Sequence, residues 1–567
     1  MAKCQRTMRA SQPPRHSVIH QAEGTAESIV DRLLESQQQL TAVEKFSQRY
    51  TSVTTPANES QYRDLIPADG LEDGEQYSFE IDLDACSGCK ACVAACHSLN
   101  GLEEGEIWRN VGLLTGGDDF NPVVQHVTSA CHHCVEPACM HGCPVRAYEK
   151  DPVTGIVEHL DDQCIGCKYC MFTCPYDVPS YSESKGIVRK CNMCTDRLSA
   201  GQAPACVQAC PHEAIKIRKV NKDSVRAEAI SSLNGANDSS ALLPGAPSSR
   251  LSLPTTRYIG KPKVISDGKP VDFHVAKAQH AHFPLVFMLT LTQMALGVFA
   301  VALLVRWAGS VDERTLAISN MVGFGSLVLG LIVATLHLGR PDKAYRAMSG
   351  FRTSWLSREI IGFNGFAAPA SGLFALSMFS FWPDWVVAQT GLLAIVTVVA
   401  GVLAVECSVM LYVVTGRPLW SSMRTHGLFF LTAVVLGLAS LILVLAATGW
   451  SGSAALRWLS VGLAIACGMK LAIELQLLSH LKSDETTPEK LSAQVLVADK
   501  KNHGYARLAV AAIGGILIPV MLAIGLFSAN AVLPAAILFA CVFLGEVIER
   551  YLFFAISNAR RMPGAPN

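Results

Sequence analysis

The sequence lacks a net charge, a targeting signal and any even spread of cysteine. Its 47 Lys and Arg residues balance 47 Asp and Glu residues, so overall charge does not favour a nucleic-acid partner. Residues 1–9 lead into a polar stretch that has neither the apolar core of a signal peptide nor a twin-arginine pair. These absences argue against a secreted protein held by disulfides, and they predict a cysteine-rich part that stays in a reducing cytoplasm.

Apolar residues make up 50% of the chain, and most of them lie beyond His282. They form eight stretches, each near the roughly 20 residues that an α-helix needs to cross a bilayer. A chain of 567 residues is also too long for one compact core. We therefore expect an all-α eight-helix transmembrane bundle over residues 278–567, with helices near 283–305, 316–338, 359–381, 385–412, 427–449, 454–478, 506–528 and 531–555.

Lys and Arg are distributed unevenly between the loops of this bundle. The loops after helices one, three, five and seven hold three of them, whereas the loops after the even helices hold fifteen. Because cytoplasmic loops collect Lys and Arg, we expect a multi-pass protein of the inner (cytoplasmic) membrane with its N-terminal part on the cytoplasmic side. The fifteen are Arg340, Lys343, Arg346, Arg352, Arg358, Arg417, Arg424, Lys482, Lys490, Lys500, Lys501, Arg507, Arg550, Arg560 and Arg561.

Three segments precede the bundle. Residues 1–75 form a polar extension with one amphipathic run, residues 28–46, which either packs on its own domain or docks onto a partner subunit. Residues 76–218 hold the cysteines, beginning with a strand-like run at Tyr77. Residues 219–277 are rich in Ser, Asn, Gly and Pro, which is typical of a flexible linker.

Sixteen of the twenty cysteines lie between Cys86 and Cys210. One group, Cys164, Cys167, Cys170 and Cys174 followed by Pro175, has the Cys-x2-Cys-x2-Cys-x3-Cys-Pro spacing of bacterial two-cluster ferredoxins. In that pattern three thiolates bind irons of one cube and the fourth binds another cube, so the groups should work in pairs. The remaining cysteines, Cys4, Cys407, Cys467 and Cys541, stand apart, and we interpret the last three as packing residues.

Three further groups are variations on this spacing: Cys86, Cys89, Cys92 and Cys96; Cys131, Cys134, Cys139 and Cys143; Cys191, Cys194, Cys206 and Cys210. Tetrahedral zinc sites are the alternative, but they usually join two separated Cys-x2-Cys pairs rather than crowding cysteines into single groups. Sixteen thiolates divide evenly into four 4Fe–4S clusters. We therefore expect an α+β ferredoxin-like iron–sulfur domain made of two dicluster units.

The order and spacing of the four groups resemble the electron-transfer subunits of the dimethyl sulfoxide reductase family of molybdopterin enzymes. The resemblance implies that groups one and four pair, as do groups two and three. It assigns four ligand sets: Cys86, Cys89, Cys92 and Cys210; Cys96, Cys191, Cys194 and Cys206; Cys131, Cys134, Cys139 and Cys174; Cys143, Cys164, Cys167 and Cys170.

Polar residues interrupt the edge of the membrane region at His337 and at Glu359. Taken singly, His337 is an interfacial residue and Glu359 a helix N-terminal charge. Together they suit quinol oxidation, which releases two protons beside an apolar pocket. Both segments resemble the membrane-anchor subunit of the same family, which implies a quinone site at these two residues.

Other ionisable groups in the membrane region leave alternatives open. A bis-histidine haem would draw on His337, His426 and His480, although the resemblance implies no haem. Charge at membrane depth is costly and is a functional indication by default. A contact between helices explains these charges equally well, so we assign no role to Glu406, Glu546, Glu549 or the Lys470–Glu474 pair.

We interpret the chain as a redox subunit that exchanges electrons between menaquinone or ubiquinone and a molybdopterin-containing catalytic subunit, as in anaerobic respiration. Its own chemistry would be quinol oxidation or quinone reduction, because it holds no substrate-reducing centre. One alternative is the quinone-reducing subunit of a cytoplasmic sulfite-type dehydrogenase. Another is a redox-coupled, ion-translocating membrane module.

Overall fold

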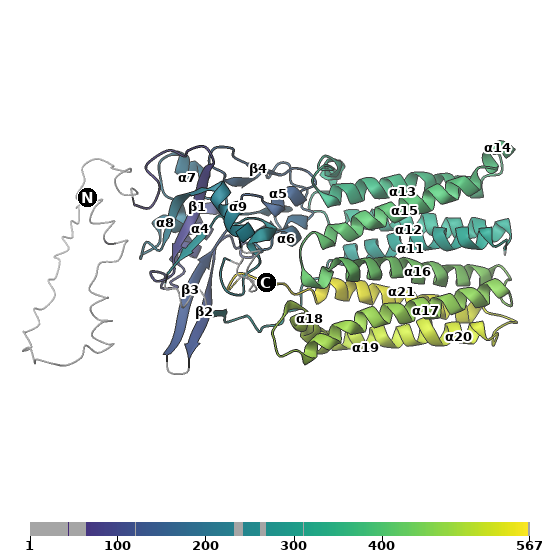
Figure 1. Cartoon of the computed structure of the whole chain (residues 1–567). Coiled ribbons are helices and arrows are strands. Elements are labelled where there is room, and N and C mark those ends of the chain that lie inside the picture. The colour runs from purple at the N-terminus through teal and green to yellow at the C-terminus, as the bar shows by residue number, and fades with distance from the viewer. Residues whose placement is uncertain are drawn as a thin grey trace, which may run out of the picture. The chain divides into compact units, whose positions relative to one another are not determined.

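The computed structural model describes residues 44, 64–118, 121–231, 242–260, 268–309 and 311–564. The amphipathic run predicted at residues 28–46 lies outside these residues except for Glu44. Strands and short helices form the described residues between 64 and 277, here called the cysteine domain, and long helices form those from 278 on, here called the bundle (Figure 1). The predicted fold class, a small α+β domain followed by eight apolar helices, is confirmed.

The cysteine domain contains a pair of strands that lie before the first and after the last cysteine group. β1 (Glu75–Asp82) pairs antiparallel with β8 (Ile215–Asn221), so that Phe79 lies opposite Ile217. Alternate residues of a strand share a face, and Phe79 and Ile81 are both buried in the core. The strand predicted at Tyr77 is therefore present, and its pairing brings the first and last cysteine groups together.

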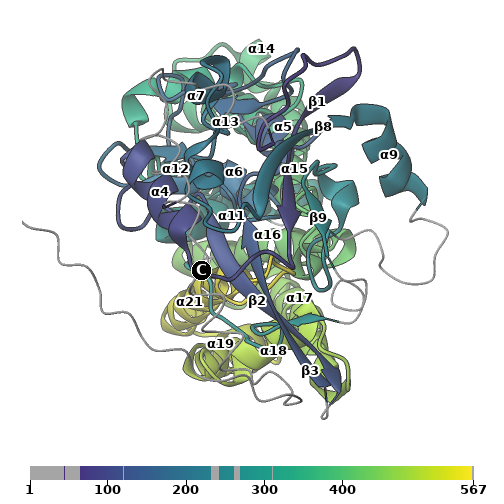
Figure 2. The same ribbon diagram turned by 90° about the vertical axis from the view of Figure 1, so that its left-hand side faces the viewer.

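The remaining strands form ribbons around this core. The longest ribbon joins β2 (Asn110–Asp118) to β3 (Asn121–Ser129), and it is visible as the extended hairpin in Figure 2. Two short hairpins join β4 (Tyr148–Lys150) to β5 (Val157–His159) and β6 (Ser180–Ser182) to β7 (Ile187–Arg189). The short helices are α4 (Ala91–Asn100), α5 (Ala138–Gly142), α6 (Tyr169–Thr173), α7 (Thr195–Ser199), α8 (Ala205–Gln208), α9 (Lys222–Ser231) and the 3-10 turn Ser249–Leu251.

The described part of residues 219–277 differs from the predicted flexible linker. β9 (Arg257–Ile259) pairs parallel with β1, and β10 (Lys269–Pro270) pairs with β2. Leu243 and Ala246 are buried in the core of the cysteine domain. Composition did not predict these strands. Two strands pair through hydrogen bonds between backbone N–H and C=O groups, so a Ser- and Pro-rich segment can join a sheet without a hydrophobic pattern.

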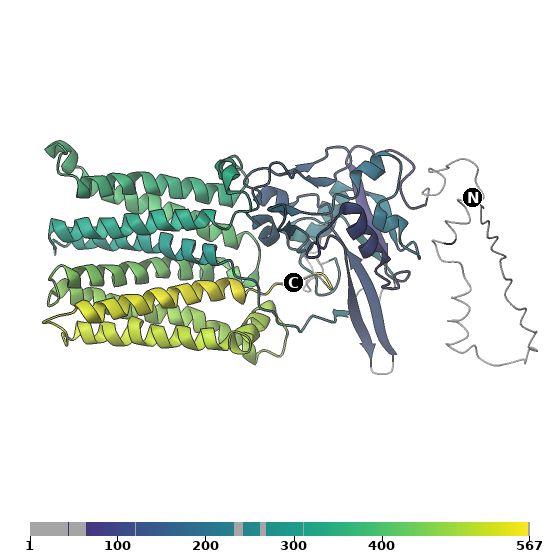
Figure 3. The ribbon, with the colours of Figure 1, turned by 180° about the vertical axis from the view of Figure 1, so that it is seen from behind.

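Eight helices of the bundle are long and apolar enough to cross a membrane, which is the predicted number. They run side by side in Figure 3. Their bounds are α11 (Phe283–Trp307), α12 (Glu313–Thr335), α13 (Trp355–Met378), α15 (Thr390–Val413) preceded by the turn α14 (Asp384–Val387), α16 (Ser422–Ala447), α17 (Ala454–Gln476), α19 (Lys501–Val510) continuing through a π-helical turn (Ala511–Leu517) into α20 (Ile518–Ala523), and α21 (Val532–Ala555). Shorter elements are the 3-10 segments Pro341–Met348, Pro418–Trp420 and Leu477–Lys482, and α18 (Pro488–Val497).

The seventh span begins five residues earlier than predicted, at Lys501 instead of 506. Arg507 lies inside this helix and Arg550 inside α21, and both are buried, although the predicted loop charges include both. The asymmetry of charge between the two sides of the bundle does not depend on these two residues. In the same region Cys467 and Cys541 pack closely against Gly515 and Gly514, as expected of packing residues.

Candidate functional site

The four cysteine groups share one backbone turn. In each group the second residue after the first cysteine has a positive φ: 73° at Gly88, 40° at His133, 69° at Gly166 and 56° at Met193. Residues with a Cβ rarely adopt this left-handed conformation, and His133 and Met193 hold it nevertheless. Successive N–H groups in such turns form concave nests of the kind found at iron–sulfur sites. All four groups are thus shaped as cradles, although their sequences differ.

Backbone N–H groups donate to cysteine sulfurs, two of them in these turns and two just after the last cysteine of a group. Hydrogen bonds to sulfur are also one of the factors that set the potential of an iron–sulfur cluster. The donor and acceptor pairs are Ala147 and Cys143 at 3.2 Å, Ala214 and Cys210 at 3.3 Å, Gly166 and Cys164 at 3.4 Å, and Met193 and Cys191 at 3.4 Å.

The folded chain brings the members of each ligand set implied by the resemblance near one another. Cys191 and Cys206 also lie near Cys131 and Cys92 of other sets, so the ligand sets stay a prediction. Cys86 has Cys89, Cys92 and Cys210 as neighbours; Cys96 has Cys194 and Cys206, with Cys191 beside Cys96; Cys174 has Cys134 and Cys139, with Cys131 beside both; and Cys170 has Cys143, Cys164 and Cys167.

Burial makes two of these thiols, Cys96 and Cys139, poor thiolates unless a cation accompanies them. It raises the pKa of Cys96 and of Cys139 to about 12, and bound iron would supply the positive charge that favours the thiolate. Within the described part of the chain, no three Cys, His, Asp or Glu side chains are close enough to hold a single metal ion. The tetrahedral grouping of a zinc site is therefore not seen among those residues, whereas a cube binds each cysteine to a different iron.

Buried donors without a partner surround the same cysteines. Among its described residues the cysteine domain contains seven such atoms: Trp108 Nε1, Arg109 Nη2, His132 Nε2, His133 Nε2, Tyr148 Oη, His159 Nε2 and Tyr176 Oη. Leaving a buried donor unsatisfied costs about 1–3 kcal/mol. Cluster sulfides and thiolates would provide acceptors here, so the residues present fit iron–sulfur clusters.

Two buried cations were missed by sequence reasoning. Arg109 is 2% exposed and lies near Cys206 and Cys92, and Lys190 is 2% exposed and directly precedes Cys191. Lys190 Nζ donates to the carbonyl of Cys191 at 2.9 Å. These charges offset the negative charge that clustered thiolates bring into a buried site. The position of Lys190 beside a cysteine was the available signal, and nothing local marked Arg109.

A cavity of about 240 Å³ lies where the cysteine domain meets the bundle, and it contains both predicted quinone-site residues. His337 and Glu359 line it together with Cys167. Its walls are otherwise largely apolar. They comprise Ile165, Tyr169 and Phe172; Leu285 and Met288; Leu331, Ala334, Thr335 and Leu338; Ala344 and Ala347; Leu356, Ile360, Phe363 and Asn364; and Leu411 and Tyr412.

His337 follows the end of α12 and keeps one ring nitrogen available. Its Nδ1 contacts the carbonyl oxygen of Ala334. Because a carbonyl only accepts, Nδ1 carries the proton and Nε2 of the neutral ring is the acceptor. Burial lowers the pKa of His337 to about 4, so the ring is neutral near pH 7.

Glu359 lies one turn into α13 and is 3% exposed. Ser408 of α15 donates to its Oε1 at 2.5 Å. Tyr169, which follows Lys168 in the third cysteine group, donates to the carbonyl of Leu411 at 2.8 Å. Sequence reasoning missed Ser408 and Tyr169, because each is placed by a contact between elements distant in the chain.

The seam between the two parts is made by hydrogen bonds to backbone carbonyls of the cysteine domain and by close approach of two glycines. Gly350 donates to the carbonyl of Pro144 at 2.8 Å, and Ser354 donates to that of Gly142 at 2.7 Å. A Cβ built on Gly339 would lie 2.0 Å from the carbonyl oxygen of Gly186. The seam therefore requires glycine at position 339.

We expect Gly339→Ala to loosen the cysteine domain from the bundle, because backbone atoms must separate to admit the methyl group. Overpacking of this kind costs about 1–3 kcal/mol. Limited proteolysis of the purified protein should cut faster between the two parts than in unaltered protein. Gly325→Ala, at a bundle position with open space around its Cα, is the matched control and should leave the rate unchanged.

The histidines of the haem alternative have separate surroundings. Both ring nitrogens of His426 contact oxygens, Nδ1 the Ser422 carbonyl at 2.7 Å and Nε2 the Glu406 carboxylate at 3.1 Å. His337 lines the cavity, whereas neither His426 nor His480 does. Glu406 thereby gains a partner in His426.

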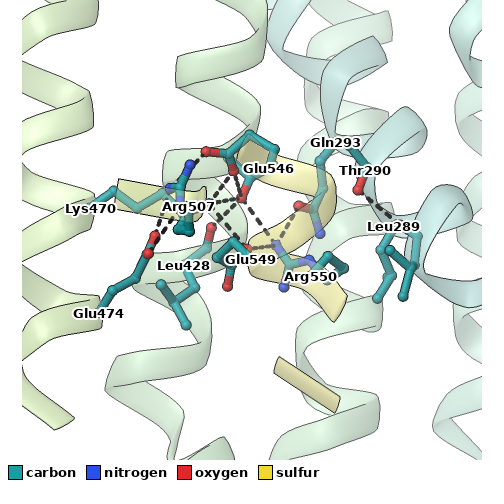
Figure 4. Close-up of polar contacts among 12 residues, drawn as sticks. Leu289, Thr290, Gln293, Leu428, Lys470, Glu474, Arg507, Glu546, Glu549 and Arg550 are labelled. Atoms are coloured by element: carbon teal, nitrogen blue, oxygen red, sulfur yellow. Dashed lines mark hydrogen bonds and ion pairs between the residues drawn. The ribbon is translucent and has the colours of Figure 1, made fainter. Parts of the chain in front are cut away.

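The other charges of the membrane region converge in one place, shown in Figure 4. Lys470 contacts Glu546, and lies 3.3 Å from Glu549; it does not pair with Glu474 as its spacing suggested. Arg507 instead holds Glu474 through two hydrogen bonds, at 2.7 and 3.0 Å. We call the six residues Lys470, Glu474, Arg507, Glu546, Glu549 and Arg550 the buried ion cluster.

Comparison with known proteins matches both parts of the polypeptide. Residues 123–220 match the family described as 4Fe-4S dicluster domain, and residues 277–556 match DMSO reductase anchor subunit. A subunit of the anaerobic dimethyl sulfoxide reductase of Escherichia coli (strain K12) is 34% identical over 204 residues, which cover 34% of this chain and 98% of the relative. The corresponding subunit of Haemophilus influenzae is 36% identical over 157 residues, covering 26% of this chain and 76% of the relative.

A third relative is named as a subunit of a different enzyme. The formate dehydrogenase-O iron-sulfur subunit of Escherichia coli is 35% identical over 169 residues, covering 27% of this chain and 56% of the relative. The cysteine domain is therefore an iron–sulfur electron-transfer domain, and the bundle is a multi-pass membrane anchor. The protein belongs to the dimethyl sulfoxide reductase family, with the electron-transfer and membrane-anchor parts fused in one polypeptide.

Proposed function

We propose that the protein exchanges electrons between a membrane quinone and a molybdopterin catalytic subunit through four 4Fe–4S clusters. The single observation that carries this proposal is the shared cavity, which has His337, Glu359 and Cys167 in its walls. An apolar cavity with a few convergent polar groups is the usual form of a small-molecule site. Here it adjoins a cysteine that would hold a one-electron carrier.

The two polar residues match the proton chemistry of a quinol. Oxidation releases two protons, and His337 Nε2 and the Glu359 carboxylate can each accept one. Ser408 holds the Glu359 carboxylate in place through its hydrogen bond. The apolar walls would bind the ring and exclude water from it.

The order of the cysteine sets supports a path leading away from the membrane. Bound clusters would supply a series of one-electron carriers. Tyr148 lies beside both Cys170 and Cys139, which links the cavity set to the next. Cys191 lies beside Cys131, and Cys206 beside Cys92, which continues the series to the set that contains Cys86.

The cysteine set farthest along this series from the cavity favours docking of a partner subunit. Cys89 is exposed, unlike most of the cysteines in the described groups. A catalytic subunit would dock over this face to bring its own centre within reach. The relatives named as dimethyl sulfoxide reductase subunits suggest a molybdopterin enzyme as that partner, and the Lys/Arg bias favours the cytoplasmic side for it.

Two alternative functions can be weighed against the geometry. A quinone-reducing subunit of a sulfite-type dehydrogenase would use the same residues in the reverse direction. An ion-translocating module needs buried acids across both leaflets, but the buried ion cluster occupies only the cysteine-domain halves of α17, α19 and α21. The electron-transfer proposal therefore stands first.

We expect the complex isolated with its native partner to contain about sixteen irons in this subunit, four for each cube. Iron analysis together with electron paramagnetic resonance during a redox titration measures this directly. Fewer than about twelve irons per polypeptide would contradict four clusters. Cys407→Ser, which changes a cysteine outside the four groups, should leave the iron content unchanged and serves as the control.

A further inference from the structure

A short hairpin beside the third cysteine group carries two buried polar rings. Tyr148 of β4 lies directly opposite His159 of β5 in the antiparallel register. Opposed residues of such a pair project from the same face of the sheet. Their ring centroids are 4.9 Å apart, with the planes at 72°. Tyr148 is 6% exposed and the His159 side chain 4%, so neither ring is available to solvent.

Each ring has a polar atom whose only neighbouring partner is a cysteine sulfur. Apart from the sulfurs of Cys170 and Cys164, Tyr148 Oη and His159 Nε2 have no hydrogen-bond partner among the described residues. Tyr148 lies beside Cys170, and His159 lies beside Cys164. Both cysteines belong to the set of Cys143, Cys164, Cys167 and Cys170. One face of one hairpin thus supplies two donors to a single proposed cluster site.

The other nitrogen of His159 explains how the ring is held. Nδ1 lies 2.8 Å from the Asp161 carboxylate, which is an acceptor. Arg189 in turn approaches Asp161 at 4.0 Å. The Asp161 carboxylate holds the ring on one side, and the Cys164 sulfur lies on the other. Asp161 therefore orients the ring toward the cysteine set.

We propose that His159 and Tyr148 are redox-tuning residues, which raise the reduction potential of the cluster at Cys143, Cys164, Cys167 and Cys170 by hydrogen bonding to its sulfurs. This inference depends on the proposed function, because it requires a cluster at that set. Reduction adds negative charge to the cluster, so the two donors stabilise the reduced form more than the oxidised form.

The location of this set explains why the reduction potential of its cluster would matter. Cys167 lines the cavity that contains His337 and Glu359. The set is therefore the first electron carrier that a quinol in the cavity would meet. A raised potential there favours transfer out of the cavity, and Tyr148 and His159 act on the cysteine sulfurs without touching the quinol.

Redox titration of the intact complex, followed by electron paramagnetic resonance, tests the inference. We expect Tyr148→Phe and His159→Ala each to shift one cluster's midpoint potential downward, and the double variant to shift it further. The shifted signal should be the one that Cys164→Ser removes or alters. Tyr148→Phe keeps the ring and the packing, so it carries the test even if His159→Ala fails to fold.

Matched controls separate tuning from general disturbance. Tyr176→Phe changes a buried tyrosine beside Cys134 and Cys174, and His97→Ala changes an exposed histidine next to Cys96. Neither should move the potential of the signal assigned through Cys164. Equal iron content in every tuning variant and control shows that the clusters are retained.

Two outcomes would overturn different claims. If Cys164→Ser alters no cluster signal, the ligand set in the proposed function is wrong. If Cys164→Ser identifies a signal whose potential stays fixed or rises in Tyr148→Phe and His159→Ala, the ligand set stands and the tuning inference is wrong.

Discussion

Quinol-dependent reduction of the clusters is expected to fall by at least about 100-fold in the Glu359→Gln variant, the usual size of a lost acid–base group. The amide fits the same space and can still contact Ser408, but it cannot accept a proton. Stopped-flow absorbance of the clusters after mixing with a reduced quinol analogue measures the rate. Reduction by dithionite, which bypasses the cavity, should be unchanged.

A second variant in the cavity and a control variant outside it complete the Glu359→Gln experiment. His337→Ala should show a loss of similar size, because it removes the second acceptor in the cavity. Glu406→Gln changes another carboxylate of the bundle, one that pairs with His426 outside the cavity. A normal quinol-dependent rate in both Glu359→Gln and His337→Ala would show that the assigned quinone site is wrong.

Removal of Lys470 is expected to cause the largest loss of stability in the bundle, about 3–5 kcal/mol for breaking a buried ion pair. Lys470→Met leaves Glu546 and Glu549 buried without that cation. They lie in the interior of the bundle, where Lys470 and Glu546 are 0% exposed. Thermal unfolding in a fixed detergent, at matched protein concentration, measures the change. Adding Glu546→Gln to Lys470→Met should recover part of the loss, because it removes one uncompensated charge.

An exposed ion pair gives the control for this prediction. Arg306 and Glu313 are 3.6 Å apart, and the Glu313 side chain is 81% exposed. Glu313→Gln should therefore change stability by less than about 1 kcal/mol. If Lys470→Met lowered the unfolding temperature no more than Glu313→Gln does, the buried ion cluster would have no role in holding the helices together.

The prediction from sequence succeeded where a local pattern determines the structure and failed where pairing partners are distant. Eight membrane helices were predicted because length and hydropathy are properties of each segment alone. Arg507 was counted with the loop charges because nothing local shows that Glu474 lies beside it. The strands at Arg257 and Lys269 were missed because their partners lie in β1 and β2.

The cysteine groups are the part that the sequence by itself determined. Within each group the short spacing between the first two cysteines brings both thiols to one backbone turn. Tertiary structure alone decided that Cys167 lines the same cavity as His337 and Glu359, since the fourth cysteine group, residues 219–277 and the first two membrane helices separate Cys167 from His337 in the sequence. It also decided that Tyr148 faces His159, and that Lys470 meets Glu546. Such contacts arise from packing and strand register. These depend on the complementary surfaces of distant segments and produce no local sequence pattern.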